Sequence, residues 1–149
     1  MQRSLFRLAL PLLLVAAVAV AADSKPPSTE DAQVVHLKDA KWAAPKLTEI
    51  PPGVMVSLVA VEPASGGTIA YAKFPPGYVF PSHWHSAAEY STLLSGKTRL
   101  VMEGKPYDME PGSYVVIPAK THHQLTCLPG AECLIFTRRS GPIDYHFDK

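Results

Sequence analysis

The chain has 149 residues, with 14 Lys and Arg against 13 Asp and Glu and a formal net charge of +1. This length allows one domain and leaves little room for a second. The near balance of charge argues against electrostatic binding of nucleic acid, so we expect a small molecule or another protein as partner.

The first 22 residues have the order of segments that is typical of a secretory signal peptide. Two arginines precede an apolar stretch over residues 8–20, and two alanines follow it. The stretch is shorter than the roughly 20 residues that span a bilayer, and it contains Pro11, so a retained anchor is the less favoured alternative. Residues 1–22 are predicted to be removed. The mature chain, with a net charge of −1, is then expected to be periplasmic or secreted, without a membrane segment.

Residues 23–52 are predicted to form an extended N-terminal segment. Their beginning is rich in Pro, Ser and charge without periodicity, which is typical of a tether. Residues 34–37 are expected to form a short strand, with Trp42 as an anchoring aromatic. Three prolines between residues 45 and 52 exclude a helix of useful length.

From residue 53 onward, short apolar and β-branched runs alternate with Gly and Pro turns, and no window of a dozen residues has a helical period. The expected strands cover residues 54–61, 68–74, 90–94, 97–103, 113–117, 123–128 and 132–138. This rhythm predicts an all-β sandwich or barrel over residues 53–149, in which closure or double layering removes exposed sheet edges.

Four side chains of metal-binding type occur within this β region. His83 and His85 lie two residues apart, so in a strand both imidazoles share one face. Glu89 follows after three small residues that would let the chain turn back toward the same point. His123 lies on a distant strand, and a ligand from there would enclose an ion. A His-X-His pair alone is more often a surface feature.

The same residues resemble the cupin superfamily. Its first motif is matched at every position by Gly77, His83, His85, Glu89 and Gly96, separated by five, one, three and six residues. The resemblance covers roughly residues 53–139. It implies a double-stranded β-helix barrel, a form of jelly roll, with one divalent transition metal at its mouth held by His83, His85, Glu89 and His123.

The second cupin motif is matched by Gly112, Pro118 and His123, with two departures. Lys120 stands where cupins usually have glycine, and Cys127 stands where they usually have asparagine. His122 competes with His123 as a ligand, but motif spacing selects His123, which points to the opposite strand face.

Three imidazoles and a carboxylate suit Fe, Mn, Ni, Cu or Zn, and affinity alone does not choose among these metals. Cupins of this kind include dioxygenases, isomerases, lyases and binders. The leading interpretation is a dioxygenase-type oxidoreductase for a small organic molecule, with Glu89 as a catalytic base or displaceable ligand. The first alternative is a non-catalytic binding or sensing cupin, whose interior would be lined by apolar residues such as Leu100, Met102 and Leu125. The second is a metal-free scaffold.

Two features outside the motifs remain open. Cys127 and Cys133 are expected either to form a disulfide, which an exported protein would retain, or to leave Cys127 free near the metal or buried as an apolar residue. The aromatic tail over residues 143–147 is expected to pack on the barrel or on a partner subunit, and a homodimer is one prediction. His36 and His146 are expected to lie at the surface.

Overall fold

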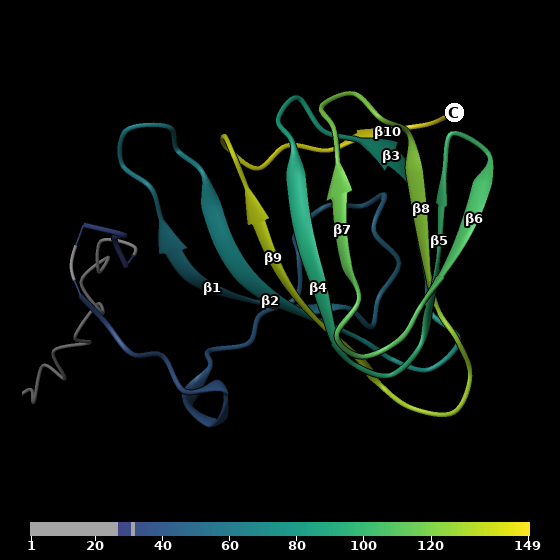
Figure 1. Ribbon diagram of the computed structural model, residues 1–149, viewed down its shortest axis with the longest axis horizontal. Helices are drawn as coiled ribbons and strands as arrows, with labels where there is room; N and C mark the ends of the chain where they lie inside the picture. Colours follow the sequence, from purple (N-terminus) through teal and green to yellow (C-terminus); the bar gives the residue numbers. More distant parts are fainter. Residues whose placement is uncertain (1–26, 31) are drawn as a thin grey trace, which may run out of the picture.

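The computed structural model describes residues 27–30 and 32–149, which form two antiparallel five-stranded sheets (Figure 1). The predicted signal peptide lies outside the described residues. In the part of the chain that is described, no helix is long and apolar enough to cross a membrane.

Strands that are distant in sequence lie side by side in both sheets, as expected for a jelly roll. The first sheet has the order β1-β2-β9-β4-β7, with the bounds Met55–Val61, Thr68–Phe74, Cys133–Arg139, Glu89–Ser95 and Tyr114–Ile117. The second has the order β10-β3-β8-β5-β6, with the bounds His146–Phe147, Val79–Trp84, His123–Cys127, Thr98–Met102 and Lys105–Met109. This arrangement confirms the predicted all-β cupin barrel.

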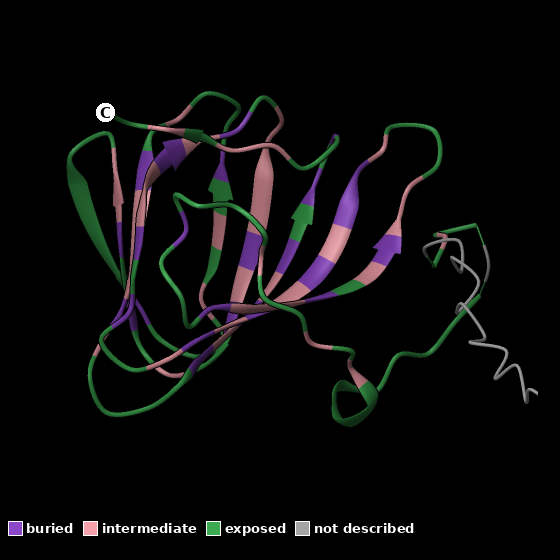
Figure 2. Cartoon of the chain, turned by 180° about the vertical axis from the view of Figure 1, so that it is seen from behind, coloured by how far each residue is buried: buried purple, intermediate pink, exposed green. Residues whose placement is uncertain are grey.

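The core lies between the two sheets and follows the alternation of the strands. In β2, buried and partly exposed residues alternate along all seven positions. Buried bands alternate with less buried ones along strands of both sheets, as expected where one face of each sheet is turned to the core (Figure 2). Leu93 of β4 and Leu100 of β5 are the largest side chains that are almost fully enclosed.

The strand predicted over residues 34–37 is wrong. The structure has a single 3-10 turn, η1, at Leu37–Asp39, and Val34 is 82% exposed. These apolar residues meet no strand with which they could pair. Trp42 does act as an anchor, because the Lys73 Nζ lies 4.1 Å from the centre of its ring.

Strand β6, Lys105–Met109, was not among the predicted strands. Only Met109 is buried in it, so an alternating apolar pattern is missing. Pro106 fits there because β6 is the edge of its sheet, where a missing backbone N–H breaks no ladder.

The disulfide prediction is confirmed between Cys127 at the end of β8 and Cys133 at the start of β9, whose Cα atoms lie 5.9 Å apart. Both side chains are fully buried. The alternative of a free Cys127 near the metal is wrong, because Cys127 and His123 occupy opposite ends of β8.

Candidate metal centre

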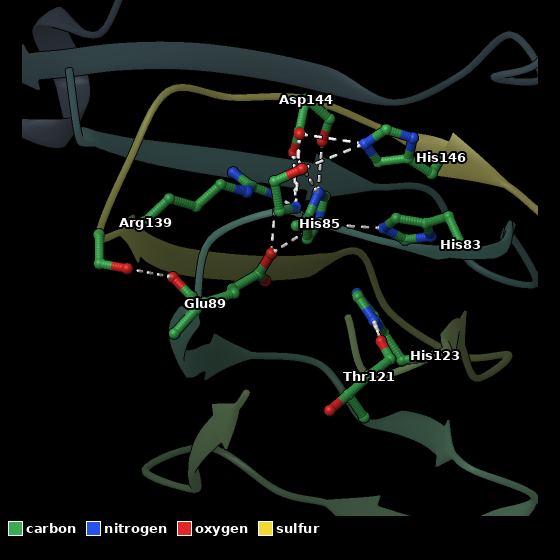
Figure 3. A network of polar contacts seen from close by, with 11 residues as sticks. His83, His85, Glu89, Thr121, His123, Arg139, Asp144 and His146 are labelled. Atoms are coloured by element: carbon green, nitrogen blue, oxygen red, sulfur yellow. Dashed lines mark hydrogen bonds and ion pairs between the residues drawn. The ribbon is translucent and has the colours of Figure 1, made fainter. Parts of the chain in front are cut away.

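Three buried imidazoles meet at one end of the barrel (Figure 3). His83 belongs to β3, His85 follows directly after β3, and His123 opens β8. Their side chains supply ligand nitrogens that all lie within 4.8 Å of one another, with 3.2 Å between the Nε2 atoms of His83 and His85. The structure therefore brings together the three histidines singled out from the sequence.

A bulge in β3 places His83 opposite His123. Phe80 pairs with Leu125, but the next pair along the ladder is His83 with His123, so β3 contains one more residue than β8 between these points. A bulge of this kind changes the face to which the following side chains point. Without it, strict alternation from the inward-facing Phe80 would turn His83 away from the barrel interior.

The other ring nitrogen of each histidine is held by the backbone. Each Nδ1–H donates to a carbonyl: that of Pro81 for His83 at 2.7 Å, of Asp144 for His85, and of Thr121 for His123 at 2.9 Å. These bonds fix the tautomer and leave the Nε2 lone pairs directed at a common point. Outer hydrogen bonds of this type orient histidine ligands in metal sites.

The surroundings keep two of the rings neutral. Burial, together with repulsion from His123, lowers the pKa of His83 to about 3, although its hydrogen bond to Pro81 acts in the opposite direction. Burial also lowers the pKa of His123. Neutral imidazole is the form that binds metal, so these shifts favour a ligand role.

Glu89 lies beside the histidines. Its Oε2 is 3.1 Å from His85 Nε2, and its Oε1 accepts a hydrogen bond of 2.8 Å from Ser91. Burial would raise the pKa of Glu89, but the Arg139 guanidinium outweighs it and holds the pKa well below its usual range. A carboxylate thus faces imidazole nitrogens.

Arg139 is a site residue that the sequence reasoning missed. It pairs directly with Glu89 across β4 and β9, and its Nη2 lies 2.7 Å from Glu89 Oε2. It is only 6% exposed, and the charge of Glu89 raises its pKa although burial acts to lower it. The available signal was the inward alternation of β9, which ends on Thr137 and Arg139 after Cys133 and Ile135.

This donor set fits a divalent cation better than it fits hydrogen bonding among its own members. With the Nδ1 protons committed, the Nε2 atoms of His83 and His85 are two acceptors 3.2 Å apart. His85 Nε2 and Glu89 Oε2 are likewise two acceptors 3.1 Å apart, and the donor beside them is Arg139 Nη2, 2.7 Å from Oε2 and 3.4 Å from Nε2. Two nitrogens bound to one metal at about 2.1 Å lie roughly 3–4 Å apart, as His83 and His85 do. The three histidines would hold such an ion and leave positions open.

An apolar cavity of about 90 Å³ extends from the centre into the barrel. Leu100 and Leu125 line it as expected, whereas Met102 packs against the core without lining it. The polar lining groups include Glu89, Ser91, Thr137, Arg139 and Tyr145, together with His83 and His123. The interior thus combines an apolar body with a polar end.

The C-terminal segment closes the site. Strand β10 pairs with the end of β3, and the Tyr145 ring lies 5.0 Å from that of His85 and 5.4 Å from that of His83. The aromatic tail therefore packs on its own barrel. His146 stacks on Trp84 at 3.7 Å and stays outside the centre, as predicted. His36, also predicted at the surface, is exposed.

Lys120 takes the left-handed conformation that its position requires. Its φ is +63°, a value that glycine adopts more readily, and its backbone N–H donates to the carbonyl of His85 at 2.8 Å. The departure from the usual glycine therefore leaves the turn geometry intact and ties this loop to a site histidine.

Comparisons with known proteins agree with this architecture. The sequence profile of the ChrR cupin-like domain matches residues 30–143. No curated protein matches by sequence. Similar solved structures include the polyketide cyclase RemF of Streptomyces resistomycificus, with a TM-score of 0.66 and 18% identity over 80% of this chain and 87% of the other. KdgF of a Halomonas species has a TM-score of 0.62 and 21% identity over 74% and 94%. A predicted oxalate decarboxylase of Thermotoga maritima has a TM-score of 0.63 and 16% identity over 72% of this chain and 98% of the other.

Proposed function

The chain belongs to the ChrR cupin-like family, and from this membership and the site geometry we propose that it is a metal-dependent enzyme acting on a small organic molecule. His83, His85 and His123 would hold one divalent transition metal, with Glu89 as a fourth ligand or as a base beside it. The observation that carries the proposal is the buried Glu89–Arg139 pair, set between the imidazoles and an apolar cavity.

Polar groups beside the centre distinguish this proposal from a purely binding cupin. A binder needs only shape and apolar contact, whereas an enzyme needs groups that hold a proton or orient a substrate. The low pKa of Glu89 keeps it a carboxylate that can ligate a metal, while Arg139 can orient an anionic oxygen. When bound, the metal supplies a Lewis acid and open positions for substrate, water or dioxygen.

Dioxygenase-type oxidation is the leading reaction within this proposal. The similar folds include a polyketide cyclase and a predicted oxalate decarboxylase, so reactions without dioxygen are the second candidate. This assignment of a reaction class is argued from the similarity of folds. The residues that surround the metal suit both, because each requires a dry site and a group that moves a proton.

Turnover with and without air tests the proposal. The mature chain, loaded in turn with Fe, Mn, Ni, Cu or Zn, would be incubated with a panel of small carboxylates, phenols and enols, with His123→Ala as the metal-free control. Oxygen uptake with substrate loss in air alone supports a dioxygenase, and loss in both atmospheres supports a non-oxidative enzyme. Metal retention without turnover of any compound would favour the binding or sensing alternative.

We also propose that the protein is exported to the periplasm or secreted. A buried disulfide supports this, because such bonds persist in oxidising compartments and are rare in the cytosol. Sequencing the N-terminus of the protein recovered from each cell fraction tests it, and a mature chain that begins near Asp23 is the expected result.

A homodimer stays a prediction, to be measured by sedimentation of this mature protein.

A further inference from the structure

Two inward-facing residues of β9 have buried donor atoms that nothing else in the described part of the chain satisfies. The Nε of Arg139 and the Oγ1 of Thr137 have no hydrogen-bond partner, although their side chains are 6% and 5% exposed. Both residues line the cavity beside the metal centre. A buried donor without a partner costs free energy, so a ligand that accepts hydrogen bonds at this place would be stabilised.

The charges of the site point to the kind of ligand. This step rests on the proposed function, because it counts the metal. Glu89 and Arg139 cancel each other, and histidines that bind a metal are neutral. Asp144, whose Oδ1 lies 3.9 Å from His85 Nδ1, is one-third exposed, so a divalent ion leaves the buried groups of the centre with an excess of positive charge. Uncompensated charge in a low-dielectric interior is costly, and an anion entering the cavity relieves that cost.

The rest of the cavity sets the shape of such an anion. Beyond the polar end, the walls are apolar side chains from both sheets, among them Phe80, Leu100, Met109, Ile117, Leu125 and Ile135. A bare inorganic anion would leave these walls without contacts. A small organic molecule with one anionic end and an apolar body matches both parts of the cavity.

We propose that the ligand or substrate of this site is a small organic anion, a carboxylate or an enolate, whose charged oxygen lies between the metal and Arg139 and whose apolar body fills the barrel. Arg139 is the residue that determines this specificity. Its guanidinium offers several N–H donors in one plane. Nη2 faces Glu89 and His85, whereas the Nε–H has no partner and is a free donor. Thr137 adds a hydroxyl on the same strand.

Calorimetric titration of the metal-loaded mature chain with butyrate and with butyramide tests the proposal, because these probes share their shape and differ in charge. Butyrate is expected to bind at least tenfold more tightly, and acetate more weakly than butyrate, because it lacks the apolar body. Arg139→Gln should abolish most of the preference, whereas Arg138→Gln, a neighbour whose side chain is 46% exposed, should leave it unchanged.

A second variant keeps the test decisive if Arg139→Gln fails to fold. Glu89→Gln removes the negative charge that competes with the ligand, so it should shift the ratio of the butyrate and butyramide affinities severalfold in favour of butyrate. Elemental analysis of each sample separates the two proposals. A protein that holds metal yet binds both probes equally overturns this inference alone, and a protein that holds no metal overturns the proposed function as well.

Discussion

His122 and His123 are neighbours in the chain, yet their imidazoles lie on opposite sides of the sheet. His123 is 4% exposed and faces His83, with 4.2 Å between the ring centres. The ring of His122 is about half exposed and its Nδ1 lies 2.7 Å from Asp148 Oδ1. Because a strand alternates its faces, one residue of separation decides between the metal centre and the surface.

This pair provides a matched test of the metal centre. His123→Ala is expected to lower the metal content of the exported protein at least tenfold, because it removes one of three nitrogen ligands. His122→Ala, which removes the same atoms on the outer face, should keep the wild-type content. Elemental analysis of both variants measures this. Equal metal loss in the two variants would contradict the assignment.

The stability of the metal-free protein should fall on acidification. The pKa of His83 is about 3 in the fold and near 6.5 in the unfolded chain, so between these values the unfolded chain binds a proton that the folded one does not. The free energy of unfolding should therefore decrease as the pH falls below about 6.5, and His83 contributes about 1.4 kcal/mol per pH unit. His123 acts in the same direction.

Denaturant unfolding of the protein, freed of metal by a chelator, at several pH values between 7.5 and 4 measures this dependence. His83→Gln provides the control, because glutamine does not titrate and the slope should become shallower. An unchanged slope in this variant would show that other groups carry the pH dependence.

Gly96 is predicted to be intolerant of a side chain. Its φ is +79°, and a Cβ built there would lie 2.7 Å from both the Sγ of Cys133 and the carbonyl oxygen of Glu132. Gly77 has nearly the same φ, +80°, but faces open space. Both alanine variants should lose about 1–2 kcal/mol from backbone strain, and Gly96→Ala roughly 1–3 kcal/mol more from overpacking. Thermal or denaturant unfolding of the two variants would show whether this difference exists.

The disulfide is expected to stabilise the barrel moderately. Because it joins residues only six apart, Cys127→Ala/Cys133→Ala should cost about 2 kcal/mol, the amount expected for closing so short a loop. Denaturant titration in oxidising and reducing buffer measures this. Reduction should bring the wild type down to the stability of the variant, and a variant as stable as the oxidised wild type would rule out such a contribution.

The barrel and the three histidines were predictable because both depend on local pattern. Alternation and turn residues within short stretches indicate the strands, and motif spacing singles out His83, His85 and His123. The bulge that turns His83 inward left no such signal. The role of Arg139 was not predictable in this way, because it depends on the register between β4 and β9, which brings Arg139 opposite Glu89. Asp144 contributes through its backbone carbonyl, which any residue possesses, so its type carried no signal.

The C-terminal segment completes the centre. The carbonyl that orients His85 belongs to Asp144, 59 residues further along the chain, and Tyr145 and Phe147 pack against the histidine rings. A chain that emerges from its N-terminal end presents His83 and His85 long before these partners arrive. A metal that needs these partners in place would bind only after the last strand docks, and its identity would then be set by the supply in the compartment where folding is completed.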